Sequence, residues 1–174
     1  MCDSQAQELL ASTDEKAACA ATPASQAVVF KARVWDVNQK SLYLQNNELL
    51  AGHLQGPNSA LEEKIYWVHN RAFAHEKFPI ILGVQDGRWC LACSSEAPPV
   101  LQLESVNITD LLKDSRETSA RFTFFRSYKE GLWRFESAAH PGWFLCTSSG
   151  PNEPLGLTQA PGPSRVVDFY FQPC

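Results

Sequence analysis

From Val28 onward, short apolar bursts alternate with polar turn residues. The bursts are rich in aromatic and branched side chains, which favours strands over helices. They cover residues 28–30, 34–35, 42–44, 49–51, 65–68, 80–82, 89–91, 100–103, 122–125, 132–135, 143–145 and 169–171. Turn formers such as Asn46-Asn47 and Asp86-Gly87 separate them. The pattern predicts an all-β domain over 28–174, with a single helical turn at 108–113.

A weak internal repeat refines this prediction. Three segments each place an aromatic residue near a leucine, then a polar turn, then a leucine-rich strand. Leu44, Leu91 and Leu145 take equivalent places, 47 and 54 residues apart. Three units of about 50 residues predict a β-trefoil of twelve short strands, in which six strands close into a barrel that hides their edges. A sandwich or jelly roll is the alternative that the spacing leaves open.

The first 27 residues differ in composition, since they are small, polar and slightly acidic. A secretory signal has a basic start and an apolar stretch of about 7–15 residues. Here the apolar Leu9 and Leu10 are followed almost at once by the polar segment 12–15. We therefore expect residues 1–27 to be a flexible amino-terminal tail or a pro-segment, and not a conventional export signal.

Composition excludes several classes of protein. The chain has 174 residues, 44% hydrophobic and 20% charged, which is typical of one globular domain. With 15 basic and 19 acidic residues the net charge is −4, which argues against a nucleic-acid partner. The sequence has no apolar run of the length that spans a membrane, so we expect no membrane insertion.

The six cysteines lie at positions 2, 19, 90, 93, 146 and 174. Cys90 and Cys93 have the spacing of a metal knuckle or a redox motif, but a zinc site would need a second ligand pair and a redox motif a βαβ setting. In a strand, positions 90 and 93 point to opposite faces. We therefore expect buried or half-buried structural thiols and no metal site. Pairing of Cys174 with Cys2 or Cys19 stays open.

The sequence offers little catalytic chemistry. It has no metalloprotease, serine-hydrolase, phosphate-loop or dinucleotide motif, so we expect no catalytic residue, no cofactor and no enzyme. The pair Glu62-Glu63 is interpreted as a solvated edge, and His140 as a turn residue. Asn107 begins a glycan acceptor pattern, Asn-Ile-Thr. Trp35 either packs against the end of the barrel or anchors a protein interface.

Four blocks of sequence are more specific. WDVNQKSLYLQNNELLAGHLQGPNSALEEKI (35–65), LQLESVNITDL (101–111), FESAAHPGWFLCT (135–147) and FYFQ (169–172) resemble the interleukin-1 cytokine family. The resemblance covers 30–174 and implies a monomeric trefoil cytokine that binds the immunoglobulin-like ectodomain of a receptor. It also implies a role in immune signalling and inflammation, outside the cell after unconventional release, with a cytoplasmic form as well.

Within the family, the first two blocks are most similar to the member that blocks the interleukin-1 receptor. The resemblance therefore implies a receptor antagonist, which competes with agonist for that receptor and does not recruit the accessory chain. The implied receptor contacts fall on Trp35, Gln39, His53, Gln55 and Tyr170. His53 departs from the pattern, because the family's antagonist has a tyrosine there.

Two further departures leave alternatives open. Asp168 stands where that antagonist has a lysine, at the position that the family resemblance marks as the accessory-chain determinant. Agonists of the family have aspartate there, and so does the member that blocks the interleukin-36 receptor. An interleukin-36 receptor antagonist and an agonist are thus alternatives, and a carbohydrate-binding trefoil is the alternative outside the family. His140 replaces a cysteine, so the implied bridge from the Cys90–Cys93 region cannot form in the same way.

Overall fold

The computed structural model describes residues 28–73 and 77–174, so the predicted tail at 1–27 lies outside the described residues. The described part contains fourteen strands in one sheet. Twelve of them are β1 (Phe30–Asp36), β2 (Ser41–Gln45), β3 (Glu48–Gly52), β4 (Ile65–His69), β5 (Pro79–Val84), β6 (Trp89–Cys93), β7 (Leu101–Ser105), β8 (Thr123–Lys129), β9 (Leu132–Ser137), β10 (Phe144–Ser148), β12 (Gly156–Thr158) and β14 (Phe169–Pro173). The other two, β11 (Glu153–Pro154) and β13 (Arg165–Val166), have two residues each.

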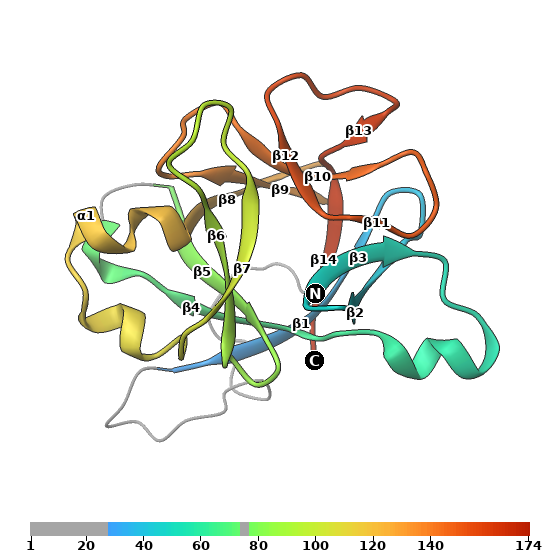
Figure 1. Cartoon of the computed structure of the whole chain (residues 1–174), viewed down its shortest axis with the longest axis horizontal. Helices are drawn as coiled ribbons and strands as arrows, with labels where there is room; N and C mark the ends of the chain where they lie inside the picture. The colour runs from blue at the N-terminus through green and yellow to red at the C-terminus, as the bar shows by residue number, and fades with distance from the viewer. Residues whose placement is uncertain (1–27, 74–76) are drawn as a thin grey trace.

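Six strands close into a barrel through antiparallel pairing. Around the ring, β1 pairs with β4, β4 with β5, β5 with β8, β8 with β9, β9 with β14, and β14 with β1. Between consecutive barrel strands the chain forms three hairpins, β2–β3, β6–β7 and β10–β12 (Figure 1). Each third of the domain from residue 28 onward thus repeats one plan, and the predicted β-trefoil with its threefold repeat is confirmed.

An equivalent leucine from each hairpin lies at the centre of the core. Leu42, Leu91 and Leu145 line a small apolar cavity of about 20 Å³ together with barrel residues such as Phe135. The sequence repeat assigned Leu44 to this position, and that assignment is wrong by two residues. Leu44 lies on the same face of β2 as Leu42. It is nearer the hairpin turn, however, and packs only against the rim of the core.

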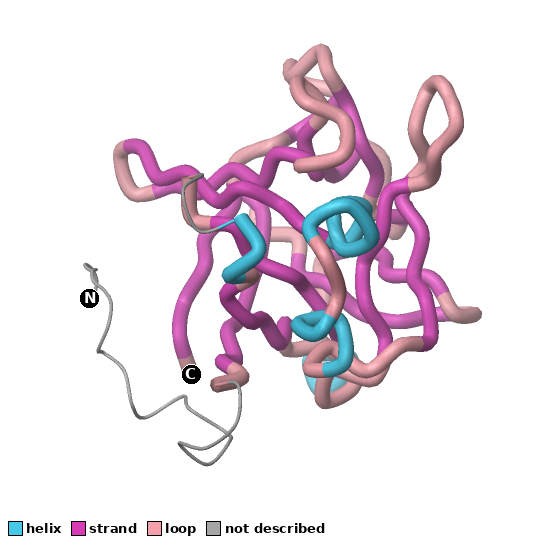
Figure 2. Tube along the Cα trace, turned by 90° about the vertical axis from the view of Figure 1, so that its left-hand side faces the viewer, coloured by secondary structure: helices cyan, strands magenta, loops and turns pink. Residues whose placement is uncertain are grey.

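A second apolar cluster lies outside the barrel, where the segment 106–122 covers β4, β5 and β6. Ile108, Leu111 and Phe122 of this segment pack against Ile81 and Cys90. The short helices of this side are visible in Figure 2. They are the 3₁₀ helices η3 (Arg71–Phe73), η4 (Asp110–Lys113) and η5 (Ala120–Phe122), and the α-helix α1 (Arg116–Ser119).

The predicted helical turn at 108–113 corresponds to η4, but the expectation of a single helical segment is wrong. Besides η3, η5 and α1, the structure has η2 (Gly56–Leu61), with a proline in its first turn. These helices are one or two turns long, too short for an apolar periodicity that a sequence pattern could reveal. In α1 it is a local cap that starts the helix, because Ser115 Oγ accepts a hydrogen bond from Thr118 N.

Arg126 fills an aromatic cage on the barrel strands. Its guanidinium carbon lies 4.7 Å from the ring centroid of Trp67 and 4.6 Å from that of Trp133, with Phe171 at 5.4 Å. Burial lowers the pKa of Arg126 to about 10, which leaves it a cation at neutral pH. The three rings stabilise that cation through their π faces, since no carboxylate pairs with Arg126 among the ion pairs of the described residues.

The buried cysteines behave as the sequence predicts. Cys93 belongs to the central core and Cys90 to the outer cluster, so the two thiols point to opposite faces of β6. Burial raises the pKa of Cys90 to about 12 and also raises the pKa of Cys93 and Cys146. All three side chains are buried. These thiols pack as small apolar groups, and they are poor nucleophiles at neutral pH.

We expect Cys90, Cys93 and Cys146 to resist alkylation in the folded protein. Folded protein is treated with N-ethylmaleimide at pH 7.5, and the adducts are located by peptide mass spectrometry. The same reaction in urea is the control, and there all three should be modified. Rapid modification of any of the three before unfolding would contradict the burial described above.

Candidate functional site

The first and last strands of the barrel bring two of the predicted contact residues together. Trp35 on β1 is in register with Tyr170 on β14, and their rings stack with centroids 5.3 Å apart at 24°. Tyr170 is 37% exposed and Trp35 is half-buried. Trp35 is not a member of either core cluster. Of its two predicted environments, the structure therefore favours an outward-facing anchor.

Arg33 extends this stack. Its guanidinium carbon lies 5.0 Å from the centroid of the Trp35 ring, and its Nε donates to Glu62 Oε2 at 3.0 Å. Glu63 accepts from Gln85 Nε2 at 2.7 Å. The interpretation of Glu62 and Glu63 as a solvated edge is thus wrong, since each carboxylate has a partner and the Glu62 side chain is only 16% exposed.

Gln39 lies in a turn that a buried carboxylate organises. Asp36 Oδ1 accepts from the backbone N of Asn38 at 2.8 Å and of Lys40 at 2.9 Å. Asp36 Oδ2 accepts from Thr147 Oγ1 at 2.6 Å. Asp36 is fully buried, and Gln39 adopts a left-handed φ of 70°. Because both backbone bonds to Asp36 Oδ1 depend on this path, the turn has one favoured conformation.

Lys40 fixes the same turn to the third repeat. Its Nζ donates to the carbonyls of Ser148 and Gly150, both at 2.6 Å, and the residue is buried. A buried ammonium is costly unless its hydrogens are used. These bonds therefore hold the turn that bears Gln39 against the loop after β10.

The remaining two predicted contacts follow β3. His53 donates from Nε2 to the carbonyl of Asn38 at 2.9 Å, which links it to the turn of Gln39. Gln55 lies two residues further on, exposed, at the N-cap of η2. We call the surface formed by Arg33, Trp35, Gln39, His53, Gln55 and Tyr170 the β1–β14 face. Arg33 is the member that sequence reasoning missed, although its spacing from Trp35 placed both on one side of a strand.

Asp168 lies at the edge of the β1–β14 face and is paired within the chain. Arg134 Nε donates to Asp168 Oδ1 at 2.8 Å, and a second guanidinium nitrogen lies 3.4 Å from Oδ2. The hydrogen bond to Asp168 raises the pKa of Arg134. The Asp168 carbonyl accepts from Val37 N at 3.2 Å, so its backbone is attached to the same turn as Gln39. Arg134 was not identified from the sequence.

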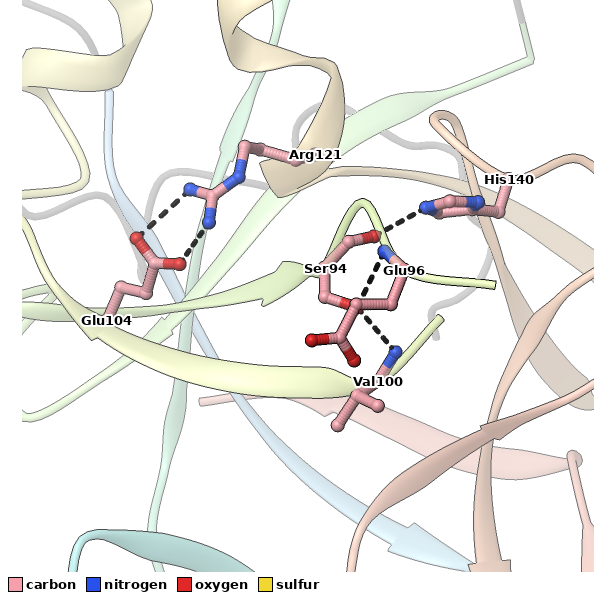
Figure 3. Close-up of polar contacts among 6 residues, drawn as sticks. All are labelled: Ser94, Glu96, Val100, Glu104, Arg121 and His140. Atoms are coloured by element: carbon pink, nitrogen blue, oxygen red, sulfur yellow. Dashed lines mark hydrogen bonds and ion pairs between the residues drawn. The ribbon is translucent and has the colours of Figure 1, made fainter. Parts of the chain in front are cut away.

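His140 is a turn residue, as predicted. Its Nε2 donates to the carbonyl of Ser94 at 2.6 Å (Figure 3), and Ser94 directly follows Cys93. The imidazole therefore joins the β9–β10 turn to the end of β6 by a hydrogen bond, in the region where the family resemblance implies a disulfide. Ser94 Oγ in turn accepts from Val100 N at 2.9 Å and orders the β6–β7 loop.

Asn107 is exposed, so the glycan acceptor pattern lies on the surface. Its Oδ1 accepts from Thr109 N and from the Thr109 hydroxyl, at 3.0 and 2.7 Å. An open groove of about 460 Å³ lies between the β2–β3 turn and β6, lined partly by Glu62 and Glu63. Both of those carboxylates are already engaged by their own partners.

Within residues 28–73 and 77–174, no three His, Cys, Asp or Glu side chains gather in a way that could hold a metal ion. No helix in that part of the chain has the length and apolar character needed to cross a membrane. The β1–β14 face offers two aromatic rings and a guanidinium on strands, with the amides of Gln39 and Gln55 in the adjoining turns. Aromatic and arginine side chains are the groups that dominate protein–protein interfaces.

Comparison with known proteins identifies the family of the chain. A family model described as Interleukin-1 / 18 matches residues 54–171. The interleukin-1 receptor antagonist proteins of pig and mouse are 51% and 50% identical over 142 residues, which is 80% of this chain and 77% and 76% of theirs. A crystal structure of a chicken interleukin-1 cavity mutant covers 83% of this chain and 95% of its own, with 35% identity and a TM-score of 0.73. The NMR structure of interleukin-36alpha, 29% identical, has a TM-score of 0.65 and covers 82% of this chain and 93% of its own.

We expect Thr147→Val to destabilise the protein. The substitution keeps the shape of the side chain and removes a donor to buried Asp36, so the free energy of unfolding in urea should fall by about 1–3 kcal/mol. Thr118→Val is the control, because it removes a hydroxyl whose bonds to Ser115 are exposed and leaves the Thr118 N–H cap in place, so it should change the free energy by less than about 0.5 kcal/mol. Equal stability of the two variants would show that the bond to Asp36 does not hold this turn.

Proposed function

The chain belongs to the interleukin-1 family, and we propose that it is a receptor antagonist, which occupies the interleukin-1 receptor without recruiting the accessory chain. The observation that carries this proposal is the identity of about one half, over most of the chain, to proteins named interleukin-1 receptor antagonist. Such a ligand acts by occupancy and needs no reaction. Each 1.4 kcal/mol of binding free energy gives it about a tenfold advantage over a competitor.

We propose the β1–β14 face as the receptor-binding surface. Trp35 and Tyr170 supply a stacked aromatic anchor, and such anchors account for much of the binding energy at interfaces. Gln39, His53 and Gln55 surround it with hydrogen-bonding groups. The bonds of Asp36 and Lys40 fix the Gln39 turn before binding, so less conformational entropy is lost on docking.

The proposed partner is the immunoglobulin-like ectodomain of the receptor, bound by one copy of this chain. The site of action is outside the cell after unconventional release, with a cytoplasmic form besides. Residues 1–27 are proposed as a tail or pro-segment outside the trefoil domain 28–174. On this route Asn107 does not meet the glycosylation machinery, so its acceptor pattern stays unmodified.

Antagonism at the interleukin-36 receptor is the second candidate, and agonism is the third. One residue favours both alternatives, because Asp168 stands where the resemblance gives lysine to the interleukin-1 antagonist.

The deciding experiment applies purified protein to cells with the interleukin-1 receptor and its accessory chain, alone and against a fixed dose of agonist. A parallel titration uses cells with the interleukin-36 receptor.

Inhibition without intrinsic signal on the first cells supports the proposal. Inhibition on the second cells alone moves the assignment to the interleukin-36 receptor. Signal from the protein by itself overturns antagonism altogether.

We expect Tyr170→Ala to weaken inhibition on the first cells about 30-fold, because loss of a central aromatic anchor costs about 2 kcal/mol or more. Gln39→Ala should weaken it less, by several-fold. Receptor affinity is measured by surface plasmon resonance, with thermal unfolding as the check on folding. Gln102→Ala is the matched control, since Gln102 is also an exposed glutamine but lies on β7. Unchanged affinity of Tyr170→Ala would remove the β1–β14 face from the receptor contact.

A further inference from the structure

We infer that Arg134 keeps this chain an antagonist by covering the carboxylate of Asp168, so that no free acid is presented to the accessory chain. This inference rests on the proposed function. It assigns a role to a residue that neither the sequence motifs nor the resemblance identified. Arg134 is thus a positioning residue that acts through Asp168.

The geometry makes the pairing specific. Arg134 approaches both oxygens of Asp168, at 2.8 Å to Oδ1 and 3.4 Å to Oδ2, which is the two-point contact that a guanidinium forms with a carboxylate. The two side chains are 46% and 32% exposed. The pair therefore lies on the surface, within reach of an approaching protein.

The backbone fixes both partners. Trp133 on β9 is in register with Phe169 on β14, which places Arg134 beside Asp168 across the strand pair. Phe169 is buried and anchors the residue after Asp168, while the Asp168 carbonyl accepts from Val37 N. Glu136, the next outward acid on β9, already accepts from Gly142 N at 2.7 Å. Arg134 and Asp168 are therefore directed at each other by the fold.

The Arg134–Asp168 pair affects which proteins can dock beside the β1–β14 face. Asp168 lies two residues before Tyr170, directly before β14, and its carbonyl accepts from Val37 N, which places it beside the turn that bears Gln39. A second protein reaching a receptor-bound ligand at this edge would meet a guanidinium already bonded to the acid. A cation offered by that protein is repelled by Arg134 and finds the Asp168 oxygens in use. Aspartate at this position is thereby compatible with an antagonist.

The test uses the full chain and the ectodomains of the interleukin-1 receptor and its accessory chain. Receptor is immobilised, each ligand variant is bound to saturation, and accessory chain is then titrated by surface plasmon resonance. The variant is Arg134→Gln, which removes the charge and keeps a polar side chain of similar reach. Arg134→Gln with Asp168→Lys is the reversal variant.

Arg121→Gln is the matched control. Arg121 forms a comparable two-point ion pair with Glu104 (Figure 3), with side chains 39% and 33% exposed, on η5 and β7. The Arg121→Gln substitution removes the same charge and the same kind of contact at a place away from the β1–β14 face. A general effect of losing an arginine would appear equally in both variants.

We expect Arg134→Gln to bind the receptor as the wild type does and to capture accessory chain about tenfold more tightly. Arg121→Gln should match the wild type, and adding Asp168→Lys should abolish the gain. Equal capture by Arg134→Gln and Arg121→Gln, with receptor binding intact, overturns this inference and leaves the proposed function standing. A gain that survives Asp168→Lys also overturns it. Failure of the wild type to bind the receptor in the first step overturns the proposed function, and this inference with it.

Discussion

Residues 32–36 of β1 hydrogen-bond along residues 169–173 of β14, so the two ends of the domain are neighbours in the barrel. This pairing closes the ring, and without it β1 and β14 would each present an open edge. It also creates the stack of Trp35 on Tyr170, whose two rings come from opposite ends of the sequence. The proposed binding surface therefore exists only when the barrel is closed, and its integrity reports on the whole fold.

Buried polar groups fix the conformation of the loops next to the barrel. Asp36 and Lys40 are both buried, and each must find partners or destabilise the fold. Asp36 finds them in its own turn and in Thr147, and Lys40 in two carbonyls of the third repeat. An apolar core alone would tolerate several conformations of the turn. These directional bonds select one, and that one presents Gln39.

The sequence was sufficient for the repeated part of the fold and insufficient for what lies between repeats. Alternating apolar residues and turn formers such as Asn46-Asn47 predict strands because those signals are local. The equivalence of Leu42 with Leu91 was missed by two residues, since it depends on how far each leucine lies from its hairpin turn. The two-residue strands β11 and β13 have no pattern of their own, because each forms against a neighbour that the tertiary structure supplies.

The candidate site also contains residues that could be predicted from the sequence and one that could not. Trp35 and Tyr170 were reached through resemblance, and the structure adds that they touch. Arg33 was recoverable from strand alternation, since it is two residues from Trp35. Arg134 was not recoverable, because its partner is 34 residues away and the pairing of β9 with β14 decides which acid it meets.

The Arg134–Asp168 pair illustrates how a weak contact can have a strong effect on binding. In water, an exposed ion pair contributes about 0–1 kcal/mol, so its loss should hardly change the stability of the domain. The balance differs once a second protein covers the pair. A partner that takes Asp168 for itself leaves the Arg134 guanidinium desolvated and unpaired, which costs more than the exposed pair contributes to folding. The pair therefore opposes recruitment more strongly than it supports folding. Arg121 and Glu104 form a similarly exposed pair away from the β1–β14 face, so we expect no such effect on docking there.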